Sequence, residues 1–427
     1  TVKKIIPRPI FLFLQPFYHF FLAFWAALFY GFPSRRISII GVTGTKGKTT
    51  AVELMHEILT EAGFKVASLS SLRFRTRDTE TRNYLKMTMP GKFFVQRFLH
   101  NAVKSGCQYV VLEVTSEGIK QFRHRFINFK VAVMTNVSPE HIEAHGGLEK
   151  YLRAKLDLFW RLPRAGIAVI NKDDVNFQRF SAATGASKIF YGKEGIEING
   201  SKLAIRDISI SDKGIEFSIN GTTIFSPLLG EFNFYNILAA AALGLGEHIA
   251  LEKISSAVSG VSGLPGRMEF VQQEPYAVVV DYAHTPESLR SVYGTLREVD
   301  KFKSLICVFG SAGGGRDKWK RPEMGKIAAE FCDQIILANE DPYDENPEEI
   351  LDQISSGFSQ STKHKVQSTK KIFDRREAIR EALKSAKAGD VVIITGKGAE
   401  QWMMGLRGTK TPWDDRKVVG EELRNFN

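Results

Sequence analysis

The stretch Gly41-Val-Thr-Gly-Thr-Lys-Gly-Lys-Thr-Thr50 decides the fold expected for this chain. It follows a short apolar run, Ile37 to Ile40, and leads into a helical pattern from Ala51 to Glu61. A glycine-rich turn between a strand and a helix directs backbone N–H groups and a helix N-terminus at a phosphate. The strict phosphate-loop pattern needs glycine where Val42 stands, so this loop is a variant of it. The order of strand, turn and helix predicts a nucleoside triphosphate site.

Two side chains of this loop suit a phosphate and its metal ion. Lys48 can reach the β- and γ-phosphates, and the Thr49 hydroxyl can ligate Mg²⁺. Glu113, which closes an apolar strand pattern, is a second candidate Mg²⁺ ligand, although such a residue is as often a solvated strand end. The residues expected at the phosphates are Gly44, Thr45, Lys46, Gly47, Lys48, Thr49 and Thr50.

Composition narrows the class of protein and of partner. The 427 residues are 43% hydrophobic and 25% charged, which is typical of a globular chain of two or three domains. The net charge of +11 suits anionic substrates or an anionic membrane surface. Nucleic acid is not expected as a partner, because no basic run alternates with aromatic residues as in a nucleic-acid module.

The three cysteines, Cys107, Cys307 and Cys332, lie far apart in the sequence. Their spacing fits no disulfide or zinc framework, so we expect small buried thiols in a reducing compartment.

Residues 9–33 form an apolar, aromatic-rich segment in which only Gln15 and His19 are strongly polar. A signal peptide is not indicated, because no small-residue cleavage site follows. Pro16 is expected to break the run and to leave it short of the roughly 20 residues that span a membrane. Basic residues flank the segment, so it suits a helix or hairpin lying in the membrane interface. A helix packed on the protein body is the open alternative.

The rest of the chain alternates apolar runs with amphipathic stretches, which predicts an α/β fold. Its first part is expected to be a P-loop-type ATPase domain with a mostly parallel sheet, and hairpins over 187–228 should extend that sheet. A Rossmann-like α/β domain should follow. The expected division is 1–35 for the apolar segment, 36–264 for the central domain and 265–427 for the C-terminal domain. The expected strands are 37–42, 108–114, 130–135, 166–171, 277–281, 304–309, 334–338 and 391–395; the expected helices are 49–62, 92–105, 148–160 and 233–243.

Two further sites carry titratable side chains. The turn Glu140-His-Ile-Glu-Ala-His-Gly146 holds two acids and two histidines, but no third zinc ligand stands nearby, so zinc is not expected. Lys155 lies on a predicted helix, where its ordinary role would be that of a surface lysine.

Taken together, these motifs resemble the Mur ligases over roughly residues 36–427. The resemblance rests on Gly44 to Thr50, Glu113-Val-Thr-Ser116, Thr135 to Gly146, Ala154-Lys155, Leu229 to Asn236 and Pro265 to Glu269. Asp281-Tyr-Ala-His-Thr-Pro286, Gly315-Arg-Asp-Lys318, Lys320-Arg-Pro322 and Gly396-Lys-Gly-Ala-Glu400 are similar to the MurE-like branch, the UDP-N-acetylmuramyl-tripeptide synthetases.

The resemblance implies an amide ligase that consumes ATP. ATP would phosphorylate a carboxylate of the acceptor, and an amine would displace phosphate from the acyl phosphate. Lys48 would contact the phosphates. Thr49 and Glu113 would hold one Mg²⁺, and His141 would help to hold a second. Lys155 would react with CO₂ to give a carbamate that also faces the metal.

The resemblance also implies further binding residues. Asn233 and Asn236 would lie near the adenine, Asp281 at the ribose and Arg267 at the phosphates across the domain seam. Thr88, Thr115, Ser116 and Arg123 would contact an acceptor such as UDP-MurNAc-L-Ala-D-Glu. The residues implied at the incoming amino acid are Arg316, Glu340, Asp341, Tyr343, Gly396 and Glu400.

Two departures from the family pattern affect the substrates. Only about 35 residues precede the central domain, so a uridine-nucleotide domain is expected to be missing, and an acceptor near the membrane would fit. Diaminopimelate-adding members carry Asp-Asn-Pro-Arg where this chain has Glu340-Asp-Pro-Tyr343. Tyr343 cannot pair with a distal carboxylate as arginine does, and two acids add negative charge. An amino acid with a basic side chain is therefore favoured over diaminopimelate.

Other functions compete with this one. Ligases of the poly-γ-glutamate, cyanophycin and folylpolyglutamate types share the ATPase core. A non-catalytic nucleotide-binding protein docked at the inner face of the membrane is the alternative from another class. Lys155 together with His141 favours an active ligase in the cytoplasm, because a pure binding module needs no second metal site.

Overall fold

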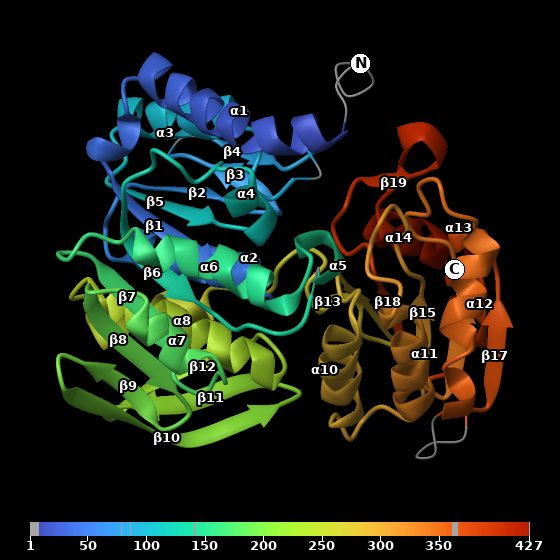
Figure 1. Ribbon diagram of the computed structural model, residues 1–427. Helices are drawn as coiled ribbons and strands as arrows, with labels where there is room; N and C mark the ends of the chain where they lie inside the picture. Colours follow the sequence, from blue (N-terminus) through green and yellow to red (C-terminus); the bar gives the residue numbers. More distant parts are fainter. Residues whose placement is uncertain (1–7, 78, 86, 141, 361–365, 427) are drawn as a thin grey trace.

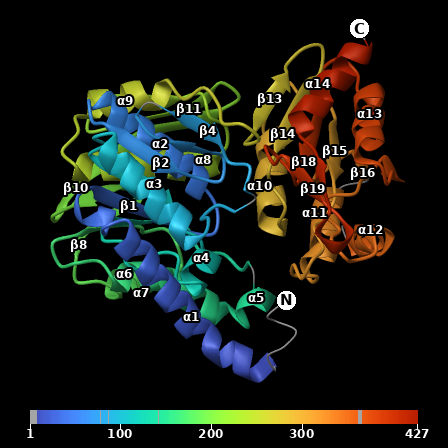
Figure 2. The same cartoon turned by 90° about the horizontal axis from the view of Figure 1, so that it is seen from above.

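The structure is a computed structural model that describes residues 8–77, 79–85, 87–140, 142–360 and 366–426. Two α/β bodies lie side by side (Figures 1 and 2). The first is built on a twelve-stranded sheet and the second on a six-stranded sheet. The predicted fold class is confirmed: a mostly parallel central sheet with appended hairpins is followed by a second α/β unit.

The centre of the first sheet is parallel, and its strands are buried on both faces. Ile40 and Val42 of β1 point into one hydrophobic core, and Ile39 points into the other. The parallel strands are β8 (Ser187–Gly192), β7 (Ile167–Asn171), β6 (Phe129–Met134), β1 (Ser38–Thr43), β5 (Tyr109–Glu113) and β2 (Val66–Leu69). Antiparallel strands extend both ends: β9 (Gly195–Ile198), β10 (Ser201–Ser211), β11 (Gly214–Ile219) and β12 (Thr222–Ser226) at one, β3 (Arg73–Arg75) and β4 (Glu80–Arg82) at the other.

Helices cover both faces of this sheet (Figure 1). One face packs against α2 (Lys48–Glu61), α8 (Glu231–Gly246) and α9 (Leu251–Ser259). The other packs against α3 (Lys92–Lys104), α6 (Leu148–Trp160) and α7 (Phe177–Ala182). Two short helices, α4 (Ser116–Lys120) and α5 (Ile142–His145), follow the ends of β5 and β6.

The second body has five parallel strands and one antiparallel edge strand, β13 (Glu269–Gln272). The parallel strands are β14 (Ala277–Asp281), β18 (Val391–Thr395), β15 (Leu305–Phe309), β16 (Gln334–Leu337) and β17 (Ser368–Lys371). On one face lie α10 (Pro286–Arg297), α11 (Lys320–Phe331) and α12 (Pro347–Ser355), and on the other α13 (Arg375–Ser385) and α14 (Asp415–Phe426). A small ribbon consists of β19 (Trp402–Met404) and β20 (Lys410–Pro412).

The expectation of free thiols was wrong for two of the three cysteines. Cys307 on β15 and Cys332, directly after α11, form a disulfide. Cys332 leads into β16, which pairs with β15, so the crossover α11 returns the chain to the side of Cys307. Spacing in the sequence does not reveal this return. Cys107 is a buried free thiol, as expected.

The apolar segment forms one helix, α1 (Arg8–Phe29), which continues through Pro16. The expected break at Pro16 was wrong, since the loss of one backbone hydrogen bond is offset where the following turns pack on the protein. Phe20 and Phe24 place their rings 5.2 and 5.5 Å from that of Phe126. The helix lies beside α3 (Figures 1 and 2). None of the helices in the described ranges is long and apolar enough to cross a membrane.

Candidate functional site

The loop between β1 and α2 has the backbone shape of a phosphate cradle. Gly47 directly precedes α2 with φ +77°, and a Cβ there would lie 2.0 Å from Asn236 Oδ1. Gly44 has φ +151°, and a Cβ there would lie 1.9 Å from Thr135 Oγ1. A side chain at either position would collide with a neighbour in a conformation that non-glycine residues rarely adopt. The loop can therefore approach a ligand only with glycine at these positions.

The segment after β6 holds this loop in place. Lys46 N donates to Asn136 Oδ1 at 2.9 Å, and Thr135 Oγ1 donates to Lys46 O at 2.7 Å. Ser138 N donates to Thr45 Oγ1 at 3.0 Å. These contacts rigidify the loop before any ligand binds.

Lys48 folds back over the loop. Its Nζ donates to Gly44 O at 3.0 Å and to Thr45 O at 2.7 Å. The ammonium thus lies over the cradle, within reach of a phosphate that enters it.

Three oxygen-bearing side chains converge beside the start of α2. The Thr49 hydroxyl donates to Glu113 Oε2 at 2.9 Å, and the Ser71 hydroxyl donates to the same oxygen at 3.0 Å. Glu113 is buried at the end of β5. Hydroxyl and carboxylate oxygens are the donors that Mg²⁺ prefers, so this cluster fits the metal. Ser71 was missed in the sequence, where it stands in an ordinary-looking Ser-rich turn.

Lys155 is buried on α6 with an exposed fraction of 1%, so it is not a surface lysine. Its Nζ donates to Gly44 O at 2.5 Å and lies 4.4 Å from the centroid of the Tyr151 ring. Burial, and next the Lys48 ammonium, hold the pKa of Lys155 well below its usual value. A lysine in this position favours the neutral, nucleophilic amine.

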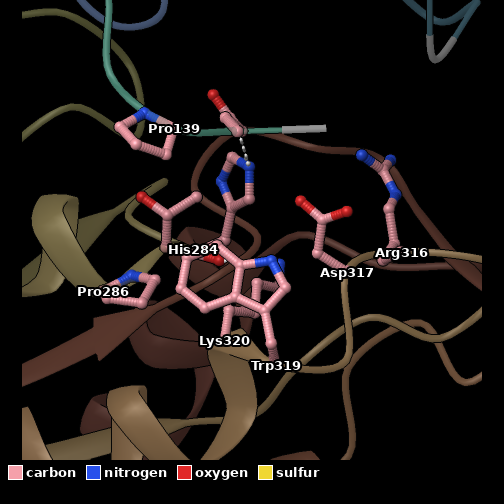
Figure 3. A pocket seen from close by; sticks show the side chains of 9 residues that line it. Pro139, His284, Pro286, Arg316, Asp317, Trp319 and Lys320 are labelled. Atoms are coloured by element: carbon pink, nitrogen blue, oxygen red, sulfur yellow. Dashed lines mark hydrogen bonds and ion pairs between the residues drawn. The ribbon is translucent and has the colours of Figure 1, made fainter. Parts of the chain in front are cut away.

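His141 lies outside the described residues. The turn around it reaches the second body, because Asp317 accepts hydrogen bonds from Ile142 N at 3.3 Å and Glu143 N at 3.1 Å. A small cavity opens at this seam (Figure 3). His284 projects toward Glu140, with Nε2 to Oε1 at 3.4 Å. The lining residues are Pro139, Glu140, His284, Thr285, Pro286, Arg316, Asp317, Trp319 and Lys320.

The residues expected at the nucleoside lie on both sides of the seam. Asn236 and Asn233 are buried on α8 and linked by a 3.0 Å hydrogen bond. Asp281 accepts from Met268 N at 2.7 Å and from Ala283 N at 2.6 Å. Arg267 stacks on Tyr282, 4.3 Å from the ring centroid. Asp281 thus positions the backbone of the segment that carries Arg267.

The residues expected at the acceptor gather around the turn Thr88-Met-Pro90. Thr115 Oγ1 caps α4 by accepting from Gly118 N at 3.1 Å, and Ser116 is buried beside it. Arg123 donates through Nη1 to Met89 O and through Nη2 to Gln121 Oε1 at 2.7 Å.

The residues expected at the amino acid surround a lysine that was not expected. Lys397 Nζ is fully buried and lies 2.8 Å from Asp341 Oδ1 and 2.7 Å from Glu400 Oε2. Asp341 is therefore ion-paired, and it shares the single Lys397 ammonium with Glu400. Glu340 differs, because its buried Oε2 has no hydrogen-bond partner among the described residues and lies against Gly396.

Two positions complete this region. Tyr343 has φ +53° and lies against Gly314. Burial alone would lower the pKa of Arg316, but its neighbours Tyr282, Tyr343 and Glu400 outweigh burial and raise the pKa.

Comparison with known proteins now identifies the family. The profile of the Mur ligase middle domain matches residues 42–244, and that of the Mur ligase glutamate ligase domain matches residues 266–398. The chain belongs to the Mur ligase family.

Several curated relatives of this Mur ligase share one name. It is 38% identical over 94% of its length to a UDP-N-acetylmuramoyl-L-alanyl-D-glutamate–2,6-diaminopimelate ligase of Syntrophomonas wolfei, of which 81% is covered. It is 39% identical to the Gloeobacter violaceus ligase of the same name, with coverage of 93% and 79%. A solved structure of a ligase of this name superposes with a TM-score of 0.60 at 31% identity, covering 91% of this chain and 79% of the other.

Family membership establishes the reaction class. This Mur ligase is an ATP- and Mg²⁺-dependent enzyme that forms an amide bond in peptidoglycan precursor synthesis. The sequence of this chain is MurE-like, as expected. That the protein works without a uridine-nucleotide domain stays a prediction.

Proposed function

We propose that this Mur ligase joins a free amino acid to the carboxylate of UDP-MurNAc-L-Ala-D-Glu or a closely related acceptor, through an acyl phosphate. The observation that carries the proposal is the cluster of Lys48, Thr49, Glu113 and Lys155 around one phosphate loop. Its relatives are named for this acceptor and for diaminopimelate.

The chain's own residues prepare the transfer. Lys48 neutralises phosphate charge that develops as the bond to the γ-phosphorus breaks. Thr49, Glu113 and, by resemblance, His141 would hold Mg²⁺ at two sites, where the metal supplies charge neutralisation. Arg267 and Asp281 lie on the second body, so closure of the seam would bring them to ATP and exclude water from the acyl phosphate.

Lys155 is proposed to act as a carbamate. Its neutral amine attacks the carbon of CO₂ and loses a proton, and an anionic oxygen donor replaces a potential cation. The buried position and the lowered pKa of Lys155 support this step, because a protonated amine has no lone pair for the attack.

The incoming amino acid is proposed to carry a basic side chain, such as lysine or ornithine. Glu340 supports this, since one oxygen of its buried carboxylate has no hydrogen-bond partner in the part of the chain that the structure describes. Tyr343 offers no cation for the distal carboxylate of diaminopimelate. Asp341 gives no support, because Lys397 already pairs with it.

The first experiment measures phosphate release from Mg-ATP with UDP-MurNAc-L-Ala-D-Glu and, in turn, lysine, ornithine and diaminopimelate. Release that requires both the acceptor and one basic amino acid is the expected result. Faster turnover with diaminopimelate would overturn the amino-acid assignment. Nucleotide binding without release would favour another acceptor, as in the poly-γ-glutamate type.

We also propose that α1 rests on the inner membrane surface. Its exposed apolar side chains recur at helical spacing and form one aromatic face: Leu14, Phe17, Tyr18, Phe21, Trp25, Leu28 and Phe29. Arg35 and Arg36 follow the helix and are exposed. Aromatic rings and flanking cations suit an anionic lipid interface.

Vesicle sedimentation tests the membrane assignment. The wild type is expected to sediment with vesicles rich in phosphatidylglycerol, and the triple variant F17S/F21S/W25S should lose at least about ten-fold in partitioning. The matched control removes three exposed aromatic residues elsewhere (W160S/F225S/F373S) and should sediment like the wild type. Equal partitioning of the two triple variants would contradict the assignment.

A further inference from the structure

Three cationic or basic side chains meet where α1 touches the acceptor region. Lys92 is the first residue of α3, and its exposed fraction is 7%. Its Nζ lies 3.1 Å from Nδ1 of His19, one of the two strongly polar residues in the apolar part of α1. Arg123 is close enough that its charge lowers the pKa of both Lys92 and His19, in each case after burial. The cluster of His19, Lys92 and Arg123 is called the α1–α3 basic cluster below.

This cluster is electrostatically incomplete. Among the described residues, no carboxylate forms an ion pair with Lys92. An acid of the described residues that acts on both His19 and Arg123 is Glu117, which lies exposed on α4. A buried ammonium without a counter-charge is unfavourable, and folded proteins keep one where it has a task.

The start of α3 adds to the excess of positive charge at this place. Its N-cap, Gly91, offers no side-chain acceptor to the first N–H groups, and the first turn has no acidic residue. A helix N-terminus favours anions and disfavours a lysine, yet Lys92 stands there. Helix dipole, ammonium and guanidinium therefore all attract a negative group at one place.

The position of the cluster identifies the ligand. Arg123 holds Met89 in the turn Thr88-Met-Pro90, and Lys92 follows that turn by two residues. We propose that the α1–α3 basic cluster binds the diphosphate of the acceptor, so that α1 forms one wall of the acceptor site. This inference rests on the proposed function, because it assigns a part of the same acceptor.

The proposal gives α1 two working faces. His19 on the inner side reaches the acceptor, while the aromatic face turns away from the protein. A diphosphate occurs both in a nucleotide-sugar and in a lipid-linked sugar, and the chemistry of the cluster is the same for the two sources.

Calorimetric titration of the full chain, with the phosphate loop filled by Mg-AMPPNP, tests the assignment. UDP-MurNAc-L-Ala-D-Glu, the same sugar peptide on a lipid diphosphate in detergent, and inorganic diphosphate are titrated separately. K92Q is expected to weaken binding of the preferred acceptor by about ten-fold or more, and H19A by a smaller factor. K104Q, at the exposed far end of α3, should stay within about two-fold of the wild type.

The pH profile adds a readout that a structural role would not move. Burial lowers the pKa of Lys92 to about 8 in the free protein, with Arg123 contributing, while His19 and Glu117 face the same cluster. An anion binds the protonated form, so acceptor affinity of the wild type should be level below that pH and fall above it. K92R keeps its charge and should remove the fall without the loss in affinity that K92Q shows.

The outcomes separate the site from the proposed reaction. If K92Q and the wild type bind the acceptor equally well, the proposal is overturned. If α1 also becomes sensitive to protease in K92Q, Lys92 only anchors the helix. If neither acceptor binds to the wild type, the proposed acceptor is wrong. The titration with inorganic diphosphate then tests whether the α1–α3 basic cluster binds a diphosphate at all. Binding of inorganic diphosphate to the wild type but not to K92Q supports the site. No binding to the wild type, or equal binding to both proteins, overturns it.

Discussion

Replacing Lys155 by alanine is expected to lower kcat by about a thousand-fold or more, with a small change in the affinity for ATP. The side chain is fully enclosed, donates to Gly44 O and is proposed to become an anionic oxygen donor after reaction with CO₂. Arginine at this position cannot form a carbamate and should be as inactive as alanine. A steady-state assay at saturating substrates measures the loss.

Chemical rescue distinguishes a carbamate from a merely structural lysine. Acetate or formate can enter the space that K155A leaves and supply the missing carboxylate oxygens, so part of the activity should return. K155R fills the space and should not be rescued. K150A, an exposed position on the same helix, should behave like the wild type. Activity of K155R close to that of the wild type would rule out the carbamate.

Changing Glu113 to glutamine is expected to lower kcat by about 10²- to 10³-fold and to raise the Mg²⁺ concentration needed for half-maximal rate. The substitution keeps the shape of the side chain at the end of β5 and removes the charge that faces Thr49 and Ser71. Titration of the rate with Mg²⁺ measures both effects.

Two further variants serve as controls for the effect of E113Q. S71A removes one neutral hydroxyl that contacts Glu113 and should cost about ten-fold or less. E231Q changes an exposed acid at the start of α8 and should leave the Mg²⁺ dependence unchanged. An unchanged Mg²⁺ dependence in E113Q would mean that Glu113 does not hold the metal.

Strands buried on both faces could be read from the sequence with little error. The predicted strand 37–42 is β1 (Ser38–Thr43), and the predicted strand 391–395 is β18 (Val391–Thr395). Continuous apolar runs between turn residues leave few alternatives. The short edge strands β3 and β4 were not predicted, because three residues of mixed polarity carry no usable periodicity.

The candidate site was partly predictable for a similar reason. Gly44, Thr49 and Glu113 lie at strand ends or on a glycine-rich turn. Residues at such places often bind ligands, and the types of these three residues suit a phosphate and its metal ion. Ser71 and Lys397 could not be found, because their importance arises from contacts across the fold: Ser71 with Glu113, and Lys397 with Asp341 and Glu400. The crossover through α11, which brings Cys332 next to Cys307, likewise cannot be recognised from the spacing of the cysteines in the sequence.

One carbonyl oxygen ties two parts of the active site together. Gly44 O accepts from Lys48 at 3.0 Å and from Lys155 at 2.5 Å, so two amines compete for it and repel each other when both are charged. A triphosphate that draws Lys48 away leaves Gly44 O to Lys155, and a carbamate on Lys155 would turn the repulsion into attraction. By thermodynamic linkage, carbamate formation on Lys155 and nucleotide binding would then be coupled through Lys48, so the free concentration of dissolved CO₂ would act on the nucleotide affinity of this ligase.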